Sequence, residues 1–166
     1  MPPRATFKRM RRTAIAMFVL MLLALAAAVG AASAATGRVA YRELTSGSRG
    51  SNLPGERLQD LGRVLRSRGE ATRVMRGWDL DAAAVRNVDF SRQSLVVVLA
   101  EYQPSAGYRA RVADVSVRGR EAVVTTGVRY EGGDVAASDL ERPWVVVAVK
   151  RSDLAGVRSE ARVRRR

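Results

Sequence analysis

The sequence of 166 residues contains no cysteine and no histidine. Without cysteine the chain cannot form a disulfide, a thiolate nucleophile or a metal site built on sulfur. Without histidine it also lacks the usual general base and the only side chain whose unperturbed pKa lies near neutrality. Any catalysis would depend on carboxylates, serine or lysine, so the composition favours a non-enzymatic protein.

Lysine is almost absent, since Lys8 and Lys150 are the only two among 29 basic residues. Much of the net charge of +13 lies at the two ends of the sequence. The basic residues at these ends are Arg4, Lys8, Arg9, Arg11 and Arg12, then Arg158, Arg162, Arg164, Arg165 and Arg166. The region between them is close to balanced, so the charge alone does not predict a specific nucleic-acid-binding face.

Residues 1–35 have the pattern of a secretory signal peptide. A basic stretch precedes the apolar run Ala14–Val29, and Ala32-Ser33-Ala34 supplies a small-residue cleavage pattern before Ala35. This order of basic, apolar and small residues is the signature of a secretory leader. The alternative is an uncleaved membrane anchor with its basic side held in the cytoplasm. Either alternative predicts a secreted or cell-envelope domain outside the cytoplasmic membrane.

The first half of the remaining chain predicts one strand and one or two helices. Residues 38–44 alternate as a short strand does, and the glycine- and serine-rich stretch 46–51 predicts a loop. Leucines at helical spacing predict an amphipathic helix over residues 56–67, with Gly69 as its stop. Residues 70–88 fit either a strand and turn or a second helix, which Asp79 or Asp81 could cap.

The second half predicts a sheet. Residues 95–100 and 144–149 are continuous apolar runs, as in strands buried on both faces. A change in alternation near Val112-Ala113 predicts a bulge, and Gly119 predicts a tight hairpin. The expected fold is α+β, with a small, mostly antiparallel sheet or half-barrel, one or two helices in the first half and an N-terminal signal helix. Residues 36–157 would form one domain, followed by a solvated, frayed basic tail over residues 158–166.

The stretch from Val88 to Leu154 resembles the C-terminal domain of the protease-complex subunit PrcB family. The resemblance rests on Val88-Asp89-Phe90-Ser91 before the first core strand, on residues 102–108, and on the closing strand 143–150 with residues 151–154 after it. Ser105 and Ala106 replace the family's threonine and glycine, while Gly107 and Tyr108 match. Residues 36–87 match only loosely.

The resemblance implies a non-catalytic secreted or envelope protein that acts by protein–protein interaction, for example by supporting or stabilising a subtilisin-like protease. The corresponding partner-binding rim would be Tyr102, Pro104, Gly107 and Tyr108, because tyrosine is favoured at interfaces. The alternative is that Gly107 permits an unusual backbone conformation and Tyr108 packs under the sheet. A different function would be binding of an anionic envelope polymer or a membrane surface through Arg162, Arg164, Arg165 and Arg166.

The sequence gives little support to an enzyme. Lys150 and Ser152 could form a Ser–Lys dyad only if the lysine were desolvated and an oxyanion hole lay nearby. Asp79, Asp81 and Asp89 match no calcium-loop spacing. The glycines near residues 47–50 and 132–133 lack the Gly-Lys-Ser/Thr of phosphate-binding loops. We therefore expect no cofactor and no metal.

Overall fold

The computed structural model describes residues 37–50, 59–104, 107–132 and 140–166. The chain divides into two compact units, Met1–Ser33 and Ala34–Arg166, and all described residues belong to the second. The predicted leader therefore lies outside the described residues. Within the described ranges, no helix has the length and apolar character needed to cross a membrane.

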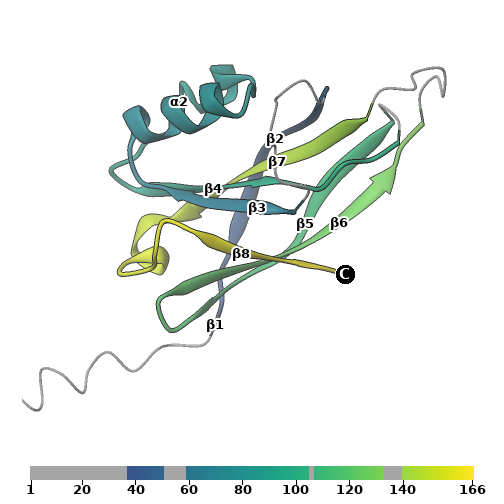
Figure 1. The fold of residues 1–166 in the computed structure, drawn as a ribbon. Coiled ribbons are helices and arrows are strands. Elements are labelled where there is room, and N and C mark those ends of the chain that lie inside the picture. The colour runs from purple at the N-terminus through teal and green to yellow at the C-terminus, as the bar shows by residue number, and fades with distance from the viewer. Residues whose placement is uncertain (1–36, 51–58, 105–106, 133–139) are drawn as a thin grey trace, which may run out of the picture. The chain divides into compact units, whose positions relative to one another are not determined.

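Two four-stranded sheets make up most of the described domain (Figure 1). In sheet A the strand order is β1 (Gly37–Arg38), β5 (Tyr108–Arg118), β6 (Glu121–Tyr130) and β8 (Ala161–Arg165). In sheet B the order is β2 (Tyr41–Gly50), β7 (Glu141–Lys150), β4 (Gln93–Leu99) and β3 (Leu61–Leu65). Neighbouring strands are antiparallel except β6 and β8, which are parallel.

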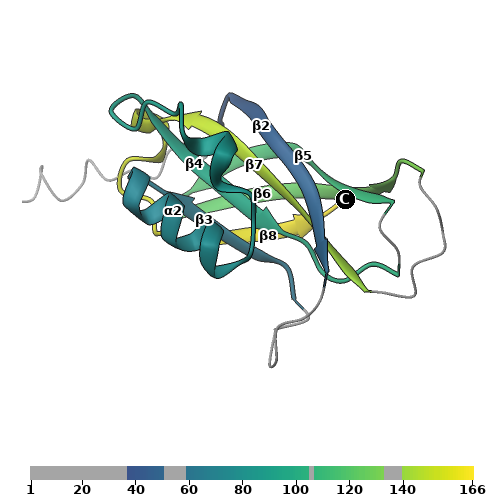
Figure 2. The same cartoon turned by 90° about the horizontal axis from the view of Figure 1, so that it is seen from above.

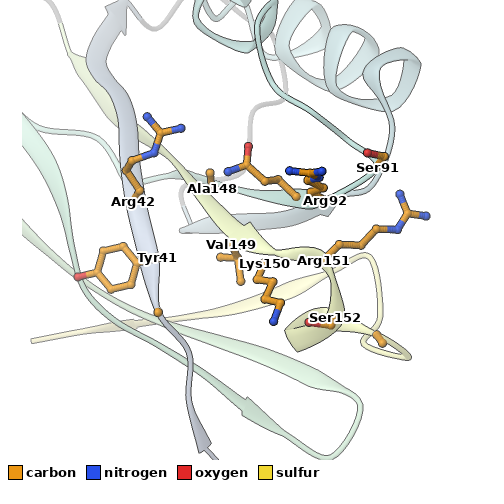
Figure 3. Close-up of a pocket in the computed structure, with 12 residues that line it drawn as sticks. Tyr41, Arg42, Ser91, Arg92, Ala148, Val149, Lys150, Arg151 and Ser152 are labelled. Atoms are coloured by element: carbon orange, nitrogen blue, oxygen red, sulfur yellow. The ribbon is translucent and has the colours of Figure 1, made fainter.

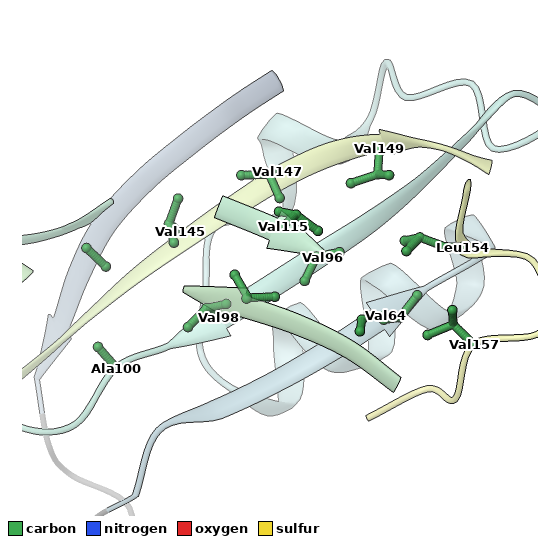
Figure 4. Packing of buried hydrophobic residues seen from close by; sticks show 13 residues of the cluster. Val64, Val96, Val98, Ala100, Val115, Val145, Val147, Val149, Leu154 and Val157 are labelled. Atoms are coloured by element: carbon green, nitrogen blue, oxygen red, sulfur yellow. The ribbon is translucent and has the colours of Figure 1, made fainter. Parts of the chain in front are cut away.

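The inner faces of the two sheets enclose a core made largely of valine (Figure 4). Val145, Val147 and Val149 of β7 point into this core, where Val115 and Val124 of sheet A meet them. Such β-branched side chains suit a pleated surface that is covered by a second sheet. Figure 4 shows Leu154 and Val157 at one end of this core. Leu154 is the last residue of the short helix η2 (Arg151–Leu154), which follows β7, and Val157 lies in the segment after this helix.

A helix covers the other face of sheet B (Figure 2). The helix α2 (Arg68–Gly77) begins after Ser67, whose Oγ accepts a hydrogen bond from the Glu70 backbone N–H at 3.2 Å. Ala71 and Met75 are fully buried and pack in a cluster with the outward side chains of β4 and β7. A short helix η1 (Ala82–Val85) follows, and Asp81 caps it by accepting from the Ala83 backbone N–H at 2.8 Å.

The two sheets are joined at both edges. At one edge the chain passes from β1 in sheet A into β2 in sheet B, and Val39 N–H donates to the Val115 carbonyl at 2.8 Å. At the opposite edge Val64 N–H of β3 donates to the Ser159 carbonyl just before β8, also at 2.8 Å. These links place β8 along β3 and fix the relative position of the two sheets.

The predicted helix over residues 56–67 is wrong where the structure describes it, since residues 61–65 form β3. Val64 faces the core between the sheets, while Leu61 and Leu65 face α2. A strand that is buried on both faces need not alternate between polar and apolar residues, so the leucines at positions 61 and 65 gave a helical spacing. Gly69, the predicted stop, is the second residue of α2.

The strand expected over residues 38–44 is present as part of β1 and β2. The loop predicted over residues 46–51 is wrong for residues 46–50, which belong to β2, and residue 51 lies outside the described residues. β2 continues there in pairing with β7, after a bulge between Glu43 and Thr45. The frayed end predicted after Gly156 is also wrong, because residues 161–165 form β8 and pair with β6.

Several predictions for the second half are confirmed. β4 and β7 cover the two apolar runs, and their residues 94–99 and 142–149 are buried. The register of β5 with β6 shifts between Val112 and Asp114, where the bulge was expected. Gly119 has φ of 65° in the hairpin that joins these strands. The described domain is thus mostly β, with one α-helix.

Candidate functional site

The residues predicted as a binding rim lie at one end of the domain, where β5 and β7 begin and β6 ends (Figures 1 and 2). Two contacts hold this end together. Gln103 pairs with Glu141 at the start of β7, and Glu131 N–H after β6 donates to the Gly107 carbonyl at 2.9 Å. The predicted residues are thus near one another, but they have different surroundings.

Tyr102 belongs to a structural group around Arg142. The Arg142 side chain is fully buried, and it donates to the carbonyls of Ala100 and Gln59, both at 2.8 Å. Its guanidinium carbon lies 5.1 Å from the centre of the Tyr102 ring, which is a cation–π distance. Burial lowers the pKa of Arg142 from its ordinary value. Tyr102 therefore helps to satisfy a buried cation.

Gly107 is required by a close approach of Tyr130. A Cβ atom at position 107 would lie 2.2 Å from Cε2 of Tyr130 and 3.0 Å from the Gly132 carbonyl oxygen. Gly107 is not among the described glycines with positive φ, so the interpretation that it permits an unusual backbone conformation is wrong. Its missing side chain leaves room for the Tyr130 ring.

Tyr108 and Tyr130 form an aromatic pair across the β5–β6 ladder. Their ring centres are 5.2 Å apart and the rings are tilted by 60°. Tyr108 is half-buried, so it supports the ring of Tyr130, which is 41% exposed. This arrangement holds an aromatic side chain at the surface in a fixed orientation, as favourable aromatic pairs do.

Tyr130 and Leu140 are the two exposed large apolar side chains of the described residues, at 41% and 50%. Both lie at the same end of the domain as Tyr108, because Leu140 immediately precedes β7. We call Pro104, Tyr108, Tyr130 and Leu140 the tyrosine rim. Sequence reasoning found Pro104 and Tyr108 but missed Tyr130 and Leu140.

The four arginines predicted to contact anions separate according to the alternation of β8. Arg162 and Arg164 are exposed on the outer face of sheet A, whereas Ala161 and Val163 turn inward to the core. Arg166 follows the strand, and its backbone N–H donates to the Thr126 carbonyl at 3.0 Å. Arg162 and Arg164 thus share one face of the strand, which Arg165 does not.

Arg165 has a structural role between the sheets. Its guanidinium contacts the carboxylates of Asp60, at 3.1 Å, and Glu101. Asp60 also accepts the backbone N–H of Glu101 at 2.8 Å. Hydrogen bonds from the guanidinium to these carboxylates raise the pKa of Arg165 above its ordinary value. Its charge is therefore already matched by neighbouring acids.

Lys150 and Ser152 line an open hollow of about 820 Å³ at the end of β7 (Figure 3). Both residues are exposed, and Ser152 Oγ donates to Asp153 Oδ1 at 3.0 Å. A Ser–Lys nucleophile needs a desolvated lysine, which this exposed position does not provide. Arg42 also lines the hollow, but Figure 3 shows it pointing in the opposite direction to Lys150. The cations there do not converge on one point.

The carboxylates considered as metal ligands have other roles. Asp81 caps η1, and Asp89 Oδ1 accepts from both the hydroxyl and the backbone N–H of Ser91, at 2.5 and 3.0 Å. Both bonds lower the pKa of Asp89 from its ordinary value, and the bond from the Ser91 hydroxyl has the larger effect. Asp79 has φ of 53° in the turn after α2. Across the described ranges, no group of three or more possible metal ligands comes together.

No protein-family model, curated protein or solved structure matches this chain. The resemblance to the PrcB family therefore stays a prediction from short motifs. The functional argument below depends on the geometry of the domain itself.

Proposed function

We propose that this chain is a non-catalytic binding protein that acts outside the cytoplasm and contacts another protein through the tyrosine rim. The observation that carries the proposal is the pair Tyr108–Tyr130, which presents a 41% exposed ring on a rigid hairpin. Tyrosine and other large aromatic residues are enriched at protein interfaces, where they supply contact area at a small entropic cost.

The surroundings of Tyr130 support the same function. Leu140 adds a second exposed apolar side chain at this end of the domain, and Pro104 adds a rigid one. Single exposed apolar residues are ordinary on protein surfaces, but a group of them at one end favours a contact site. The Glu131–Gly107 hydrogen bond joins the backbone segments next to Tyr108 and Tyr130, which favours a preformed contact site.

The proposed partner is a secreted or envelope protein. The PrcB resemblance and the predicted leader support this location, and the resemblance adds a subtilisin-like protease as a specific candidate. An acidic polymer is not the proposed ligand of the rim, because the rim residues are apolar or aromatic, whereas the neighbouring Arg109 and Arg129 project from the opposite face of sheet A.

Site-specific photocrosslinking in the producing cell tests the proposal. A photoreactive phenylalanine analogue would replace Tyr130 or Leu140 in the full chain, and Arg73 on the exposed face of α2 would carry it as a control. We expect one crosslinked protein of defined mass from positions 130 and 140 and none from position 73. No crosslink at either rim position, or the same products from position 73, would contradict the proposed site.

A further inference from the structure

The outer face of sheet A, which is turned away from the core, carries a high density of arginine. Core residues of β5, β6 and β8 alternate with residues that point outward, because successive side chains of a strand lie on opposite faces. The outward arginines are Arg109, Arg111, Arg118, Arg129, Arg162 and Arg164. The outward acids of these three strands are Asp114 and Glu121. In Figure 1 the helix α2 lies beyond sheet B, so it does not cover this face.

Small side chains occupy the middle of this face. The outward residues along the centre of β6 are Val123, Thr125 and Gly127. Val123 is only 2% exposed, and a Cβ atom at Gly127 would meet nothing within 4 Å. β6 therefore forms the floor of a lane that is open above Gly127. We call this strip, with floor residues 123, 125 and 127, the β6 lane.

Arginines lie along both sides of the β6 lane, but at different levels. On the β8 side Arg162 and Arg164 lie beside Val123 and Thr125. On the β5 side Arg111 lies beside Gly127, whereas Ser116 and Asp114 lie beside the other two floor residues. The lane spans two inter-strand spacings, about 9.5 Å, and its floor is about 13 Å long. These dimensions suit a single extended polymer chain rather than a compact ligand.

The charges along the lane are only partly matched. Arg109 lies directly opposite Arg129, just beyond Gly127, so two arginines are cross-strand neighbours at this end of the lane. Arg111 forms ion pairs with Glu131 and Glu43, at 2.9 and 3.5 Å. Arg162 lies 3.9 Å from Glu121, and Asp114 is paired with Arg38 at 3.3 Å. Within the described part of the chain, no carboxylate forms an ion pair with Arg118, Arg129 or Arg164.

We propose that the β6 lane binds a linear polyanion whose charges are phosphate groups and whose repeating unit carries no base. Guanidinium groups match phosphate oxygens in a bidentate geometry, and arginine is the residue best suited to this recognition. A phosphate chain in the lane would place negative charge beside Arg164 and, past Gly127, beside Arg129. The site uses residues outside the tyrosine rim and does not depend on the function proposed for it.

The absence of aromatic side chains among these outward residues favours such a polymer over single-stranded nucleic acid. Proteins that bind single strands combine a cationic groove with aromatic residues on which the bases stack. The outward positions of β5, β6 and β8 between residues 109 and 129 and at 162 and 164 hold none. A membrane surface is also disfavoured, because the floor residue Val123 is buried and cannot insert into lipid.

Binding of inorganic polyphosphate to the full chain, followed by fluorescence anisotropy at several salt concentrations, tests the proposal. The variant R129Q/R164Q removes two lane charges, and R73Q/R86Q removes two exposed charges on the other side of sheet B. We expect the first variant to weaken binding about tenfold and to lower the log–log salt slope by about two, and the second to change binding less than about twofold.

The variant Gly127→Val tests the lane without changing the charge. Valine suits a strand, and the space above Gly127 is empty, so circular dichroism should show an unchanged fold. We expect it to weaken polyphosphate binding about tenfold or more. Equal loss in R73Q/R86Q, or wild-type affinity in Gly127→Val, would overturn the proposed site. Tighter binding of a single-stranded DNA oligonucleotide than of polyphosphate, at equal phosphate concentration, would overturn the ligand class.

Discussion

Arg165 Nε lies 3.1 Å from Asp60 Oδ2, which connects the last strand of sheet A to the segment that precedes β3 in sheet B. The same guanidinium also contacts Glu101, after β4. Asp60 is 17% exposed at its side chain, so this group is shielded more than an ordinary surface ion pair. An end of the chain that looks in sequence like a solvated basic tail is thus held against the opposite sheet.

Replacing Arg165 with glutamine should lower the free energy of unfolding by about 1 kcal/mol, because a shielded network with several hydrogen bonds is lost. The adjacent Arg164→Gln is the matched control, since Arg164 points outward and should change stability by less than about 0.5 kcal/mol. Urea unfolding measures the free energy of unfolding of both variants. Equal effects of the two variants would show that the Asp60–Arg165 contact does not stabilise the domain.

Truncation after Ser159 should destabilise the domain by at least about 2 kcal/mol. It removes β8, uncovers the edge of β6 and exposes the core side that Ala161 and Val163 cover. Deletion of Arg166 alone is the control. Thermal unfolding and light scattering should show a lower transition and aggregation for the longer deletion only. A truncated chain as stable as the full chain would mean that residues 160–166 are dispensable, as in a frayed tail.

Gly107→Ala should cost about 1–2 kcal/mol of stability and alter the near-ultraviolet circular dichroism of the tyrosines. The new methyl group would overlap the Tyr130 ring, so the Tyr108–Tyr130 pair must separate. In a Tyr130→Ser background the same substitution should cost much less, which a double-mutant cycle measures. If the stability changes of Gly107→Ala and Tyr130→Ser simply added up in the double variant, the close approach of residues 107 and 130 would be contradicted.

Tyr102 and Tyr130 should respond differently to substitution. Tyr102→Leu removes the ring beside the buried Arg142 and should lower stability by about 1 kcal/mol, with partner binding unchanged. Tyr130→Ser removes an exposed ring and should weaken partner binding with a smaller effect on stability. Unfolding curves and affinity measurements on the same two proteins separate these effects. If Tyr102→Leu lost partner binding without losing stability, Tyr102 would have to be a binding residue and not a structural one.

The Asp89 carboxylate should titrate below its ordinary pKa because it accepts hydrogen bonds from Ser91. A pKa lowered by folding contributes stability above the unfolded-state pKa, near 4, and this contribution is lost as the pH falls through the lowered value. Ser91→Ala should therefore raise the pKa of Asp89 towards its ordinary value. Carboxyl-carbon NMR titration measures it directly, and an unchanged pKa in Ser91→Ala would contradict the assignment.

The strands that could be predicted from sequence are those whose apolar character is continuous, β4 and β7, together with the hairpin at Gly119. β3 was read as a helix because both of its faces are buried and its leucines at 61 and 65 lie four residues apart. β8 was missed because only Ala161 and Val163 face the core, while arginines fill the other positions. Its pairing partner β6 lies about 38 residues earlier, as in the Thr126–Arg164 contact, and local patterns do not report such pairing.

The candidate site was found only in part for a related reason. Counting back from the Gly119 hairpin pairs Tyr108 with Glu131, but the bulge after Val112 shifts its partner to Tyr130. The sequence predicted the bulge, so the aromatic pair could have been found by carrying the register through it. Leu140 gave no signal, because its position beside the rim depends on where β7 begins in the sheet.

The most direct test of the proposed function is a pull-down with the full chain from the producing cell's envelope and medium, at low and high salt. We predict that one secreted or envelope protein is recovered at both salt concentrations by the wild type and by R129Q/R164Q, but not by a Y130S/L140S variant that folds normally. Recovery that is equal in Y130S/L140S, or that disappears at high salt in the wild type, would contradict binding through the tyrosine rim.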